Sequence, residues 1–265
     1  MSMDWLWGLG CCCHNSNMAE RRSGLAAQCS RIQMLQVSML DYNQSEGEAT
    51  TATFGQLYGA ENILFLHSDV TSESQMQDSF IKTMEKFQKL DIVCNNAGIV
   101  NESNYEKCIS VNLVGVIRGS QLALKYMGKE NGGAGGVIVN IASITAFYPW
   151  EGAPVYTASK CGVVGFTKVL SLSCMKKHGV RVHALCPSFV DTPLLRIHDK
   201  DAKERLDALL QLCGPVLKPS EIAERFLELV VDQTRNGVVM KILGNGNIEY
   251  EDQPEGQHAE AQKPT

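Results

Sequence analysis

The chain has 265 residues, of which 44% are hydrophobic and 20% are charged, and its formal net charge is -5. This length is enough for one large α/β domain with a core that supports itself. Lys and Arg are scattered along the chain, which argues against nucleic acid or an anionic membrane surface as the main partner.

The N-terminal segment, residues 1–33, matches no expected element. Its apolar opening is interrupted by Asp4 and lacks a preceding basic stretch, so neither a cleaved signal peptide nor a membrane span is expected. Cys11, Cys12 and Cys13 are adjacent and lack a second ligand pair at zinc spacing, so we expect no metal site. An unstructured terminus is the simplest interpretation, with lipidation of these thiols as the alternative. The other cysteines are scattered singly, which indicates reduced thiols in the cytoplasm.

From residue 34 onward, short apolar runs alternate with amphipathic stretches. Strands are expected at 34–40, 62–68, 90–94, 136–143, 180–186 and 237–243, and helices at 45–58, 73–87, 105–129, 155–177 and 219–231. Apolar runs without strict alternation are typical of strands buried on both faces, and intervening helices require right-handed crossovers. The pattern predicts one α/β domain over 34–244, a Rossmann-like, doubly wound parallel sheet in three layers. A flexible polar tail is expected at 245–265.

The strongest chemical signal is the run YTASK, in which Tyr156 and Lys160 lie four residues apart on one face of an expected helix. A phenol is a poor base because its pKa is near 10, and an adjacent ammonium group would favour the phenolate and lower that pKa. Ser143, at the end of the preceding strand, can donate a hydrogen bond to a substrate oxygen. Asn112 lies inside the long helix, where an amide is a mediocre helix former, which favours a structural or water-binding role.

A Tyr-x-x-x-Lys pair alone occurs by chance in many helices. Together with Ser143, Asn112 and the run NNAG at 95–98, it resembles the short-chain dehydrogenase/reductase family in order and spacing over residues 34–243. The resemblance implies that Tyr156 is the general base for oxidation of an alcohol and that Lys160 lowers its pKa and contacts the nicotinamide ribose. It further implies that Ser143 stabilises the substrate oxygen and that Asn112 holds the water of a proton relay through Lys160.

An acidic residue at the end of the second strand of such a fold accepts hydrogen bonds from the adenosine ribose and repels a 2′-phosphate. Asp41 occupies that position and no Lys or Arg follows it directly, so NAD is expected rather than NADP. The resemblance implies further cofactor contacts at Asp69, Val70, Asn95, Ala97, Gly98, Val190 and Thr192. A helix-capping role is the alternative for Asp69. The family usually has Gly where Ser188 stands.

Several stretches, above all MGKENGGAGG at 127–136, resemble the family members that oxidise the 15-hydroxyl group of prostaglandins with NAD. The implied substrate is a hydrophobic lipid mediator, oxidised at a secondary hydroxyl to a ketone. Those enzymes have Gln where Ala153 stands, and its absence removes a hydrogen bond to the substrate hydroxyl. Another NAD-linked alcohol or steroid dehydrogenase is therefore the alternative. The resemblance also implies a homodimer formed through the long helices that carry Asn112 and the Tyr156–Lys160 pair.

One family motif is not recognisable in the sequence. Counting back from Asp41, the glycine-rich loop that approaches the cofactor pyrophosphate should lie at 13–23, where the run CHNSNMAERRS has no glycine. Either the chain is a working dehydrogenase in which Arg21 and Arg22 substitute charge for that backbone cradle, or cofactor affinity is lost and the chain is a binding or dimerising protein. A missing first strand would leave strand edges unpaired at the centre of the sheet, which favours the second hypothesis.

Overall fold

The computed structural model describes residues 36–192, 194 and 214–251. The N-terminal segment 1–33, with its cysteine cluster and its two arginines, lies outside the described residues, and so does the chain after residue 251. Among the described helices, none is long and apolar enough to cross a membrane.

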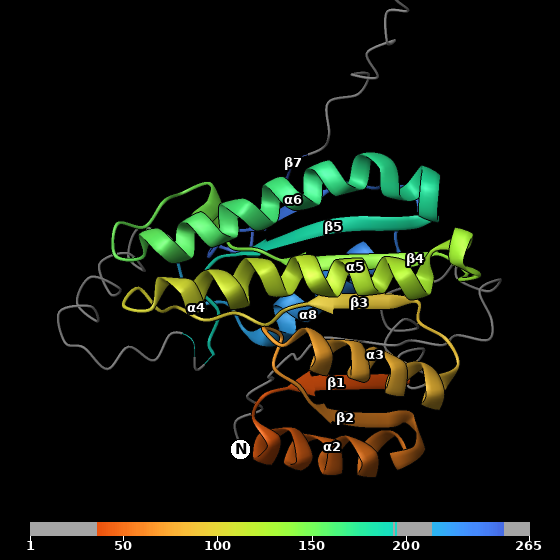
Figure 1. The fold of residues 1–265 in the computed structure, drawn as a ribbon. Helices are drawn as coiled ribbons and strands as arrows, with labels where there is room; N and C mark the ends of the chain where they lie inside the picture. Colours follow the sequence, from red (N-terminus) through yellow and green to blue (C-terminus); the bar gives the residue numbers. More distant parts are fainter. Residues whose placement is uncertain (1–35, 193, 195–213, 252–265) are drawn as a thin grey trace, which may run out of the picture.

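Strands and helices alternate along the chain in the predicted order (Figure 1). The strands are β1 (Val37–Asp41), β2 (Ile63–His67), β3 (Ile92–Asn95), β4 (Gly136–Ile141), β5 (Val180–Pro187), β6 (Val239–Ile242) and β7 (Ile248–Glu251). The helices are α2 (Gln44–Tyr58), α3 (Glu73–Phe87), α4 (Tyr105–Ile109), α5 (Gly115–Met127), α6 (Pro154–His178) and α8 (Pro219–Val231). The long helix expected at 105–129 is divided into α4 and α5 by a π-helical turn, η2 (Ser110–Val114). A short 3-10 turn, η4 (Ile144–Ala146), follows β4.

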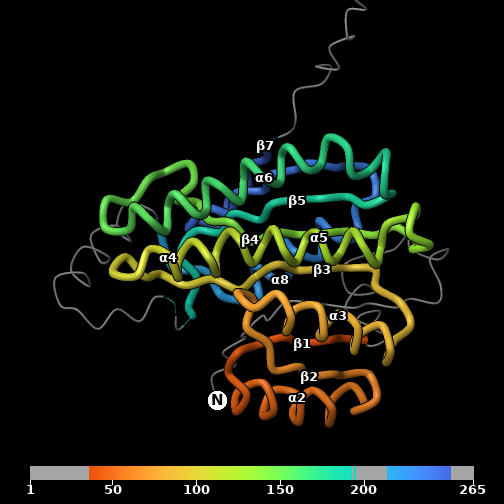
Figure 2. Tube along the Cα trace, in the orientation of Figure 1, coloured from red at the N-terminus to blue at the C-terminus, as the bar shows by residue number. Residues whose placement is uncertain are grey.

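The strands form two groups. β3, β4, β5, β6 and β7 make a five-stranded sheet in that order, parallel from β3 to β6, with β7 antiparallel at its edge. β1 and β2 form a separate parallel pair, in which Val37 lies opposite Ile63 and Asp41 opposite His67. Figure 2 shows that β1 is the strand of this pair nearer to β3. The parallel pairing confirms the α/β fold that the buried apolar runs predicted.

Helices cover both faces of the five-stranded sheet, which gives three layers. In Figure 1, α5 and α6 lie in front of the sheet and α8 lies behind it. Alternate strand residues point to the two sides: Val137 and Val139 pack in the cluster that contains α8, whereas Ile138 packs in the cluster that contains α5. This alternation follows from the period of two along a strand, and it places two apolar cores back to back.

One helix joins the two groups of strands. Phe80 and Met76 of α3 share an apolar cluster with Leu40 of β1 and Val93 of β3. Within residues 36–192 and 214–251, no strand pairs with the second edge of β1 or of β3. The N-terminal segment, in which neither a first strand nor the glycine-rich loop was recognisable, lies outside the described residues.

The flexible tail predicted from residue 245 is wrong at its beginning. Ile248–Glu251 forms β7 and pairs with β6, so that Ile248 lies opposite Ile242. Lys241 also forms an ion pair with Glu249 at 2.7 Å. The alternation of apolar and acidic residues in IEYE suits an edge strand with one face on the sheet, and the surrounding polar composition concealed it.

Candidate active site

Tyr156, Ser143 and Lys160 come together beyond the carboxyl end of β4, as the sequence predicted. Pro154 begins α6, where its fixed φ suits the first helical position, and this places Tyr156 in the first turn. Ser143 follows β4 by two residues, and its hydroxyl forms a hydrogen bond with the Tyr156 phenol. Lys160 lies one turn further along α6, with its Nζ 5.6 Å from the centroid of the Tyr156 ring.

Burial governs the protonation of this pair. Burial raises the pKa of Tyr156 to about 12, against the opposing effect of the Ser143 hydrogen bond. Burial likewise lowers the pKa of Lys160 to about 8. Lys160 is not among the groups that shift the pKa of Tyr156 here, so its expected effect on the phenol stays a prediction. Both groups lose hydration, and the Lys160 ammonium donates to the Ile141 carbonyl at 2.8 Å instead of to the phenol.

Asn112 is fully buried in the π-helical turn and clamps the loop that follows β3. Its Oδ1 accepts from the Ile99 amide at 2.8 Å, and its Nδ2 donates to the Ile99 carbonyl at 2.9 Å. The same Nδ2 donates to Ser159 Oγ at 3.0 Å, which ties the clamp to α6. The side chain thus has a structural function in the site, and its role in holding a water stays a prediction.

The turn at 95–98 contains one residue that serves the core and one that borders the site. Asn95 is 1% exposed, and its amide donates to Asn140 Oδ1 at 2.8 Å and to Ser120 Oγ at 3.0 Å. Because its side chain is engaged in the core, Asn95 has only its backbone to contact a cofactor. Ala97 packs against the core. A Cβ atom added at Gly98 would lie 3.3 Å from Lys160 Nζ, so Gly98 keeps open the space beside the lysine.

The predicted adenosine contacts lie at the carboxyl ends of β1 and β2. Asp41 ends β1, and its Oδ1 accepts from the Asn43 amide at 2.8 Å. Asp69 does not cap α3, because Ser72 does so; Asp69 Oδ1 accepts from the amide and the hydroxyl of Thr71, each at 2.8 Å. Burial opposes ionisation of Asp69, but the Thr71 hydrogen bonds and nearby positive charges hold its pKa below the ordinary value. Val70 is buried next to it.

The predicted nicotinamide loop follows β5. Its residue Val190 forms an isolated parallel bridge with Leu217, and Thr192 Oγ1 donates to the Val190 carbonyl at 3.3 Å. Ser188, where the family usually has Gly, is 8% exposed, and its amide donates to the Ile242 carbonyl at 2.8 Å. Because β4 and β5 are parallel, this loop leaves the sheet at the same edge as Ser143. The region between Leu194 and residue 214 lies outside the described residues.

Comparison with known proteins decides the family. The family model described as short chain dehydrogenase matches residues 23–203. The chain belongs to the short-chain dehydrogenases. It is therefore an oxidoreductase that uses a nicotinamide cofactor. The match begins upstream of Met34, the residue at which the sequence pattern was expected to begin.

Two sets of relatives illustrate this membership. The chain is 38% identical to 15-hydroxyprostaglandin dehydrogenase [NAD(+)] of Mus musculus, over 82% of this chain and 83% of the mouse protein. It is 37% identical to the protein of the same name from Homo sapiens, over 82% of this chain and 84% of the human protein. The crystal structure of levodione reductase superposes with a TM-score of 0.71 at 26% identity, covering 79% of this chain and 87% of that one. A Brucella melitensis 3-ketoacyl-(acyl-carrier-protein) reductase complexed with NADH gives a TM-score of 0.68 at 29% identity, covering 79% and 86%.

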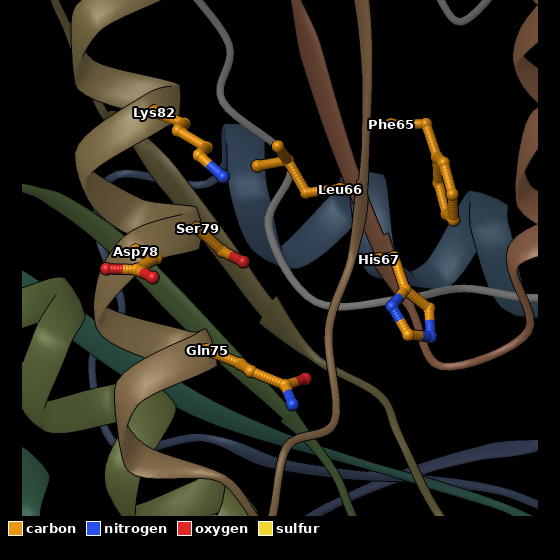
Figure 3. Close-up of a pocket in the computed structure, with 7 residues that line it drawn as sticks. All are labelled: Phe65, Leu66, His67, Gln75, Asp78, Ser79 and Lys82. Atoms are coloured by element: carbon orange, nitrogen blue, oxygen red, sulfur yellow. The ribbon is translucent and has the colours of Figure 1, made fainter.

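One further hollow lies apart from the catalytic groups of this dehydrogenase. It has a volume of about 410 Å³ between β2 and α3. Figure 3 shows its lining, which comes from β2 on one side and from α3 on the other: Phe65, Leu66, His67, Gln75, Asp78, Ser79 and Lys82. None of the predicted catalytic residues contributes to it, so we assign it no part in the chemistry.

Sequence reasoning missed one residue beside the dehydrogenase site, Glu102. Its carboxylate accepts hydrogen bonds from the amides of Val155 and Tyr156, both at 2.9 Å. The sequence carried a partial signal, because α6 begins with Pro154 after Ala153, which has no polar side chain to cap the helix. A distant cap was therefore needed, but the sequence alone could not say which residue supplies it.

Proposed function

We propose that this short-chain dehydrogenase oxidises a secondary hydroxyl group of a hydrophobic lipid mediator with NAD, and that a 15-hydroxyprostaglandin is the substrate to test first. The observation that carries the proposal is the buried Tyr156 phenol, hydrogen-bonded to Ser143 and one helical turn from Lys160. The relatives named 15-hydroxyprostaglandin dehydrogenase, similar over most of both chains, support the substrate class.

The residues suggest a division of labour. Ser143 would donate a hydrogen bond to the substrate oxygen and hold the hydroxyl against Tyr156. Tyr156 would then accept the hydroxyl proton, which requires that its phenol be ionised first. Because burial holds the pKa of Tyr156 near 12, oxidation should become faster as the pH rises. Lys160, with a pKa of about 8, can release and take up protons near neutral pH and so connect the phenol to solvent. NAD, when bound, supplies the acceptor for the hydride.

Some of the residues present fit such a cofactor. The space beside Lys160 that a Cβ atom at Gly98 would fill lies where a nicotinamide ribose is expected to meet that lysine. Asp41 ends β1 with a carboxylate, which favours NAD over NADP. The pyrophosphate half has no such support, because the run at 13–23 has no glycine.

A second candidate function follows from that missing run. A chain that keeps the catalytic residues but binds NAD weakly would act as a binding or dimerising protein. Isothermal titration with NAD separates the two: micromolar binding with thermal stabilisation supports the enzyme, whereas absence of both supports the binding protein. If NAD binds, the Tyr156→Phe variant should lose turnover of the alcohol and keep the NAD affinity, and unchanged turnover would contradict the assigned base.

The substrate assignment depends on Ala153. This residue is fully buried and packs with Cys108 and Tyr156 at the start of α6. An Ala153→Gln variant restores the amide of the prostaglandin-oxidising relatives, and it should lower KM for a 15-hydroxyprostaglandin if that group is the substrate. A gain confined to another hydrophobic alcohol, such as a steroid, would favour the alternative substrate class.

We also propose a homodimer formed through the long helices. α6 leaves a stripe of apolar side chains exposed: Val169 is 68%, Leu172 62% and Met175 47% exposed. Apolar side chains gathered at helical spacing on a surface are typical of an interface. A Val169→Lys, Leu172→Lys double variant should sediment as a monomer, and a dimer that persists would exclude this face.

A cytoplasmic location stays part of the proposal. None of the five cysteines in the described part of the chain forms a disulfide, and four of them, Cys94, Cys108, Cys174 and Cys186, are buried. Reduced buried thiols suit a reducing compartment.

Among the described residues, no group of histidine, cysteine and carboxylate side chains is arranged to hold a metal ion.

A further inference from the structure

We propose that Glu102 is a positioning residue for the active site: its carboxylate caps the first turn of α6 from another element and so fixes where Tyr156 meets the substrate. This proposal rests on the proposed function of Tyr156 as the base, and it concerns a residue that neither the catalytic motif nor the cofactor pattern includes. The contact that carries it is bidentate, with Oε2 on the Val155 amide and Oε1 on the Tyr156 amide, both at 2.9 Å.

The first turn of α6 has no other cap. Every helix leaves its first amides without a partner inside the helix, and a polar side chain at the N-cap normally satisfies one of them. Here the N-cap is Ala153, and Pro154 has no amide hydrogen. Val155 and Tyr156 are therefore the first two donors of the helix, and Glu102 accepts from both. One carboxylate thus does the work of a local cap from more than fifty residues away.

The loop that carries Glu102 is held on both sides. On one side, Ile99 is clamped through its amide and its carbonyl by Asn112. On the other side, Asn101 Oδ1 accepts from the Asn104 amide at 2.9 Å, and Asn104 Oδ1 accepts from the Lys107 amide at 3.0 Å, which caps α4. A carboxylate held in this way cannot follow a shift of α6 without breaking these contacts, so it resists movement of the helix start.

The position of Tyr156 depends on that start directly. Its own amide is one of the two donors, so Glu102 holds the nitrogen bonded to the Cα that carries the phenol side chain. Displacements of about 1 Å in a reacting group can cost about a hundredfold in rate, since the hydroxyl proton must pass along one hydrogen bond. Lys160 and the rest of α6 are anchored separately, through the Ile141 carbonyl and the sheet, which makes the first turn the part that needs a tether.

The carboxylate also places a negative charge at the start of the helix that carries Tyr156. A negative charge at a helix N-terminus offsets the positive end of the helix dipole and disfavours a phenolate nearby. Removing it should therefore move the ionisation of Tyr156 to lower pH. The other groups that face Tyr156 are unchanged by such a variant: Lys160 of α6, Cys108 of α4, Cys186 of β5 and the Ser143 hydroxyl before η4.

The test is Glu102→Gln in the full chain, with Glu106→Gln as the matched control. Gln has the shape of Glu, but one of its two terminal groups is an NH₂ donor in place of an oxygen acceptor. One of the two backbone amides therefore loses its hydrogen bond and faces another donor. Glu106 carries the same charge on the exposed surface of α4, and its Oε1 accepts only a 3.5 Å contact from Tyr105 among the contacts of the described residues. Expected for Glu102→Gln are a fall in kcat of about tenfold, KM for NAD within about twofold, and a downward shift of about half a pH unit in the acid limb of kcat/KM. Glu106→Gln should match the wild type in all three.

Two further measurements do not need turnover. Hydrogen exchange at the Val155 and Tyr156 amides should accelerate in Glu102→Gln alone, and the Tyr156 ring signals in an NMR spectrum should move in that variant alone. If the wild type neither binds NAD nor oxidises an alcohol, the proposed function fails, while these two measurements still decide the tether. The inference is overturned if Glu102→Gln keeps kcat, the pH midpoint and amide protection, or if Glu106→Gln changes them equally. Should Glu102→Gln fail to fold, Glu102→Asp, which keeps the charge but is one methylene shorter, is measured instead: kcat and amide protection should fall as in Glu102→Gln, while the pH midpoint stays at its wild-type value.

Discussion

Replacing Asn112 with Leu should destabilise the fold, because its amide is a clamp with three strong contacts. The side chain is fully buried, and it bonds to the amide of Ile99 at 2.8 Å, to the carbonyl of Ile99 at 2.9 Å and to Ser159 at 3.0 Å. Leu has the same number of side-chain heavy atoms and the same branching but no polar atom, so the variant leaves both backbone groups of Ile99 without these partners.

The magnitude follows from those two backbone groups. An orphaned buried donor or acceptor costs about 1–3 kcal/mol, and Ile99 is only partly buried, so water can reach some of its surface. The Ile99 carbonyl keeps a weak contact from Cys108 Sγ at 3.6 Å; taking about 1.5 kcal/mol for the amide and about 1 kcal/mol for the carbonyl, we expect a loss of about 2.5 kcal/mol in the free energy of unfolding. Ser159 keeps a second contact, because its hydroxyl donates to the Tyr156 carbonyl at 2.6 Å, and we therefore add nothing for it.

Urea denaturation followed by circular dichroism measures this loss. The control is Asn131→Leu, the same substitution at an exposed residue whose amide makes one long hydrogen bond, 3.4 Å to Leu124, together with a marginal 3.5 Å contact to Glu130. That variant should stay within about 0.5 kcal/mol of the wild type. A loss below about 1 kcal/mol for Asn112→Leu would refute the clamp and leave a water-holding role as the better explanation of this amide.

Two further predictions concern titration and packing. Burial, and after it the nearby Arg charges, lower the pKa of His183 to about 3. As the pH falls, the unfolded chain therefore binds a proton at this histidine before the folded chain does. The free energy of unfolding should fall by about 2 kcal/mol from pH 6.5 to 5. His183→Gln should flatten the dependence by that amount in urea unfolding at the two pH values, and an unchanged slope would contradict it. Gly98→Ala, whose Cβ would lie 3.3 Å from Lys160 Nζ, should raise KM for NAD about tenfold. Gly165→Ala, which meets open space, should leave KM unchanged, and equal effects would refute the crowding.

The order of elements could be predicted from the sequence because each signal was local. α3 begins and ends at the residues expected, since Ser72 caps it and the apolar residues of the helix recur at helical spacing on one face. The buried strands were likewise recognisable in the sequence as apolar runs. β7 was not predicted, because pairing with β6 is what makes this polar stretch an edge strand. That pairing exists only in the folded sheet.

The chemistry of the site was predictable in its members but not in its electrostatics. Spacing alone placed Tyr156 and Lys160 on one face of a helix. The rise in the pKa of Tyr156 was not foreseen, because the sequence reveals a neighbouring charge and conceals the loss of water around both groups. Glu102 and the buried amide of Asn95 were missed as structural partners for a related reason: each acts across more than twenty residues, which no local pattern records.

The choice of nicotinamide cofactor can be tested at Asp41 independently of the catalytic groups. The carboxylate ends β1, and one of its oxygens accepts from the Asn43 amide at 2.8 Å. Asp41→Asn keeps that acceptor and removes only the charge, so the turn into α2 should survive. A carboxylate about 4 Å from a 2′-phosphate charge costs up to about 4 kcal/mol at an effective dielectric constant near 20.

We therefore expect Asp41→Asn to lower the ratio of kcat/KM for NAD to that for NADP by about thirtyfold or more, the equivalent of about 2 kcal/mol. Asp78→Asn removes the same charge from the neighbouring helix α3 and should leave the ratio unchanged. A ratio that stays constant in Asp41→Asn would mean that the end of β1 does not meet the adenosine. In that case the two-stranded group would serve the fold alone, and discrimination between NAD and NADP would come from other residues.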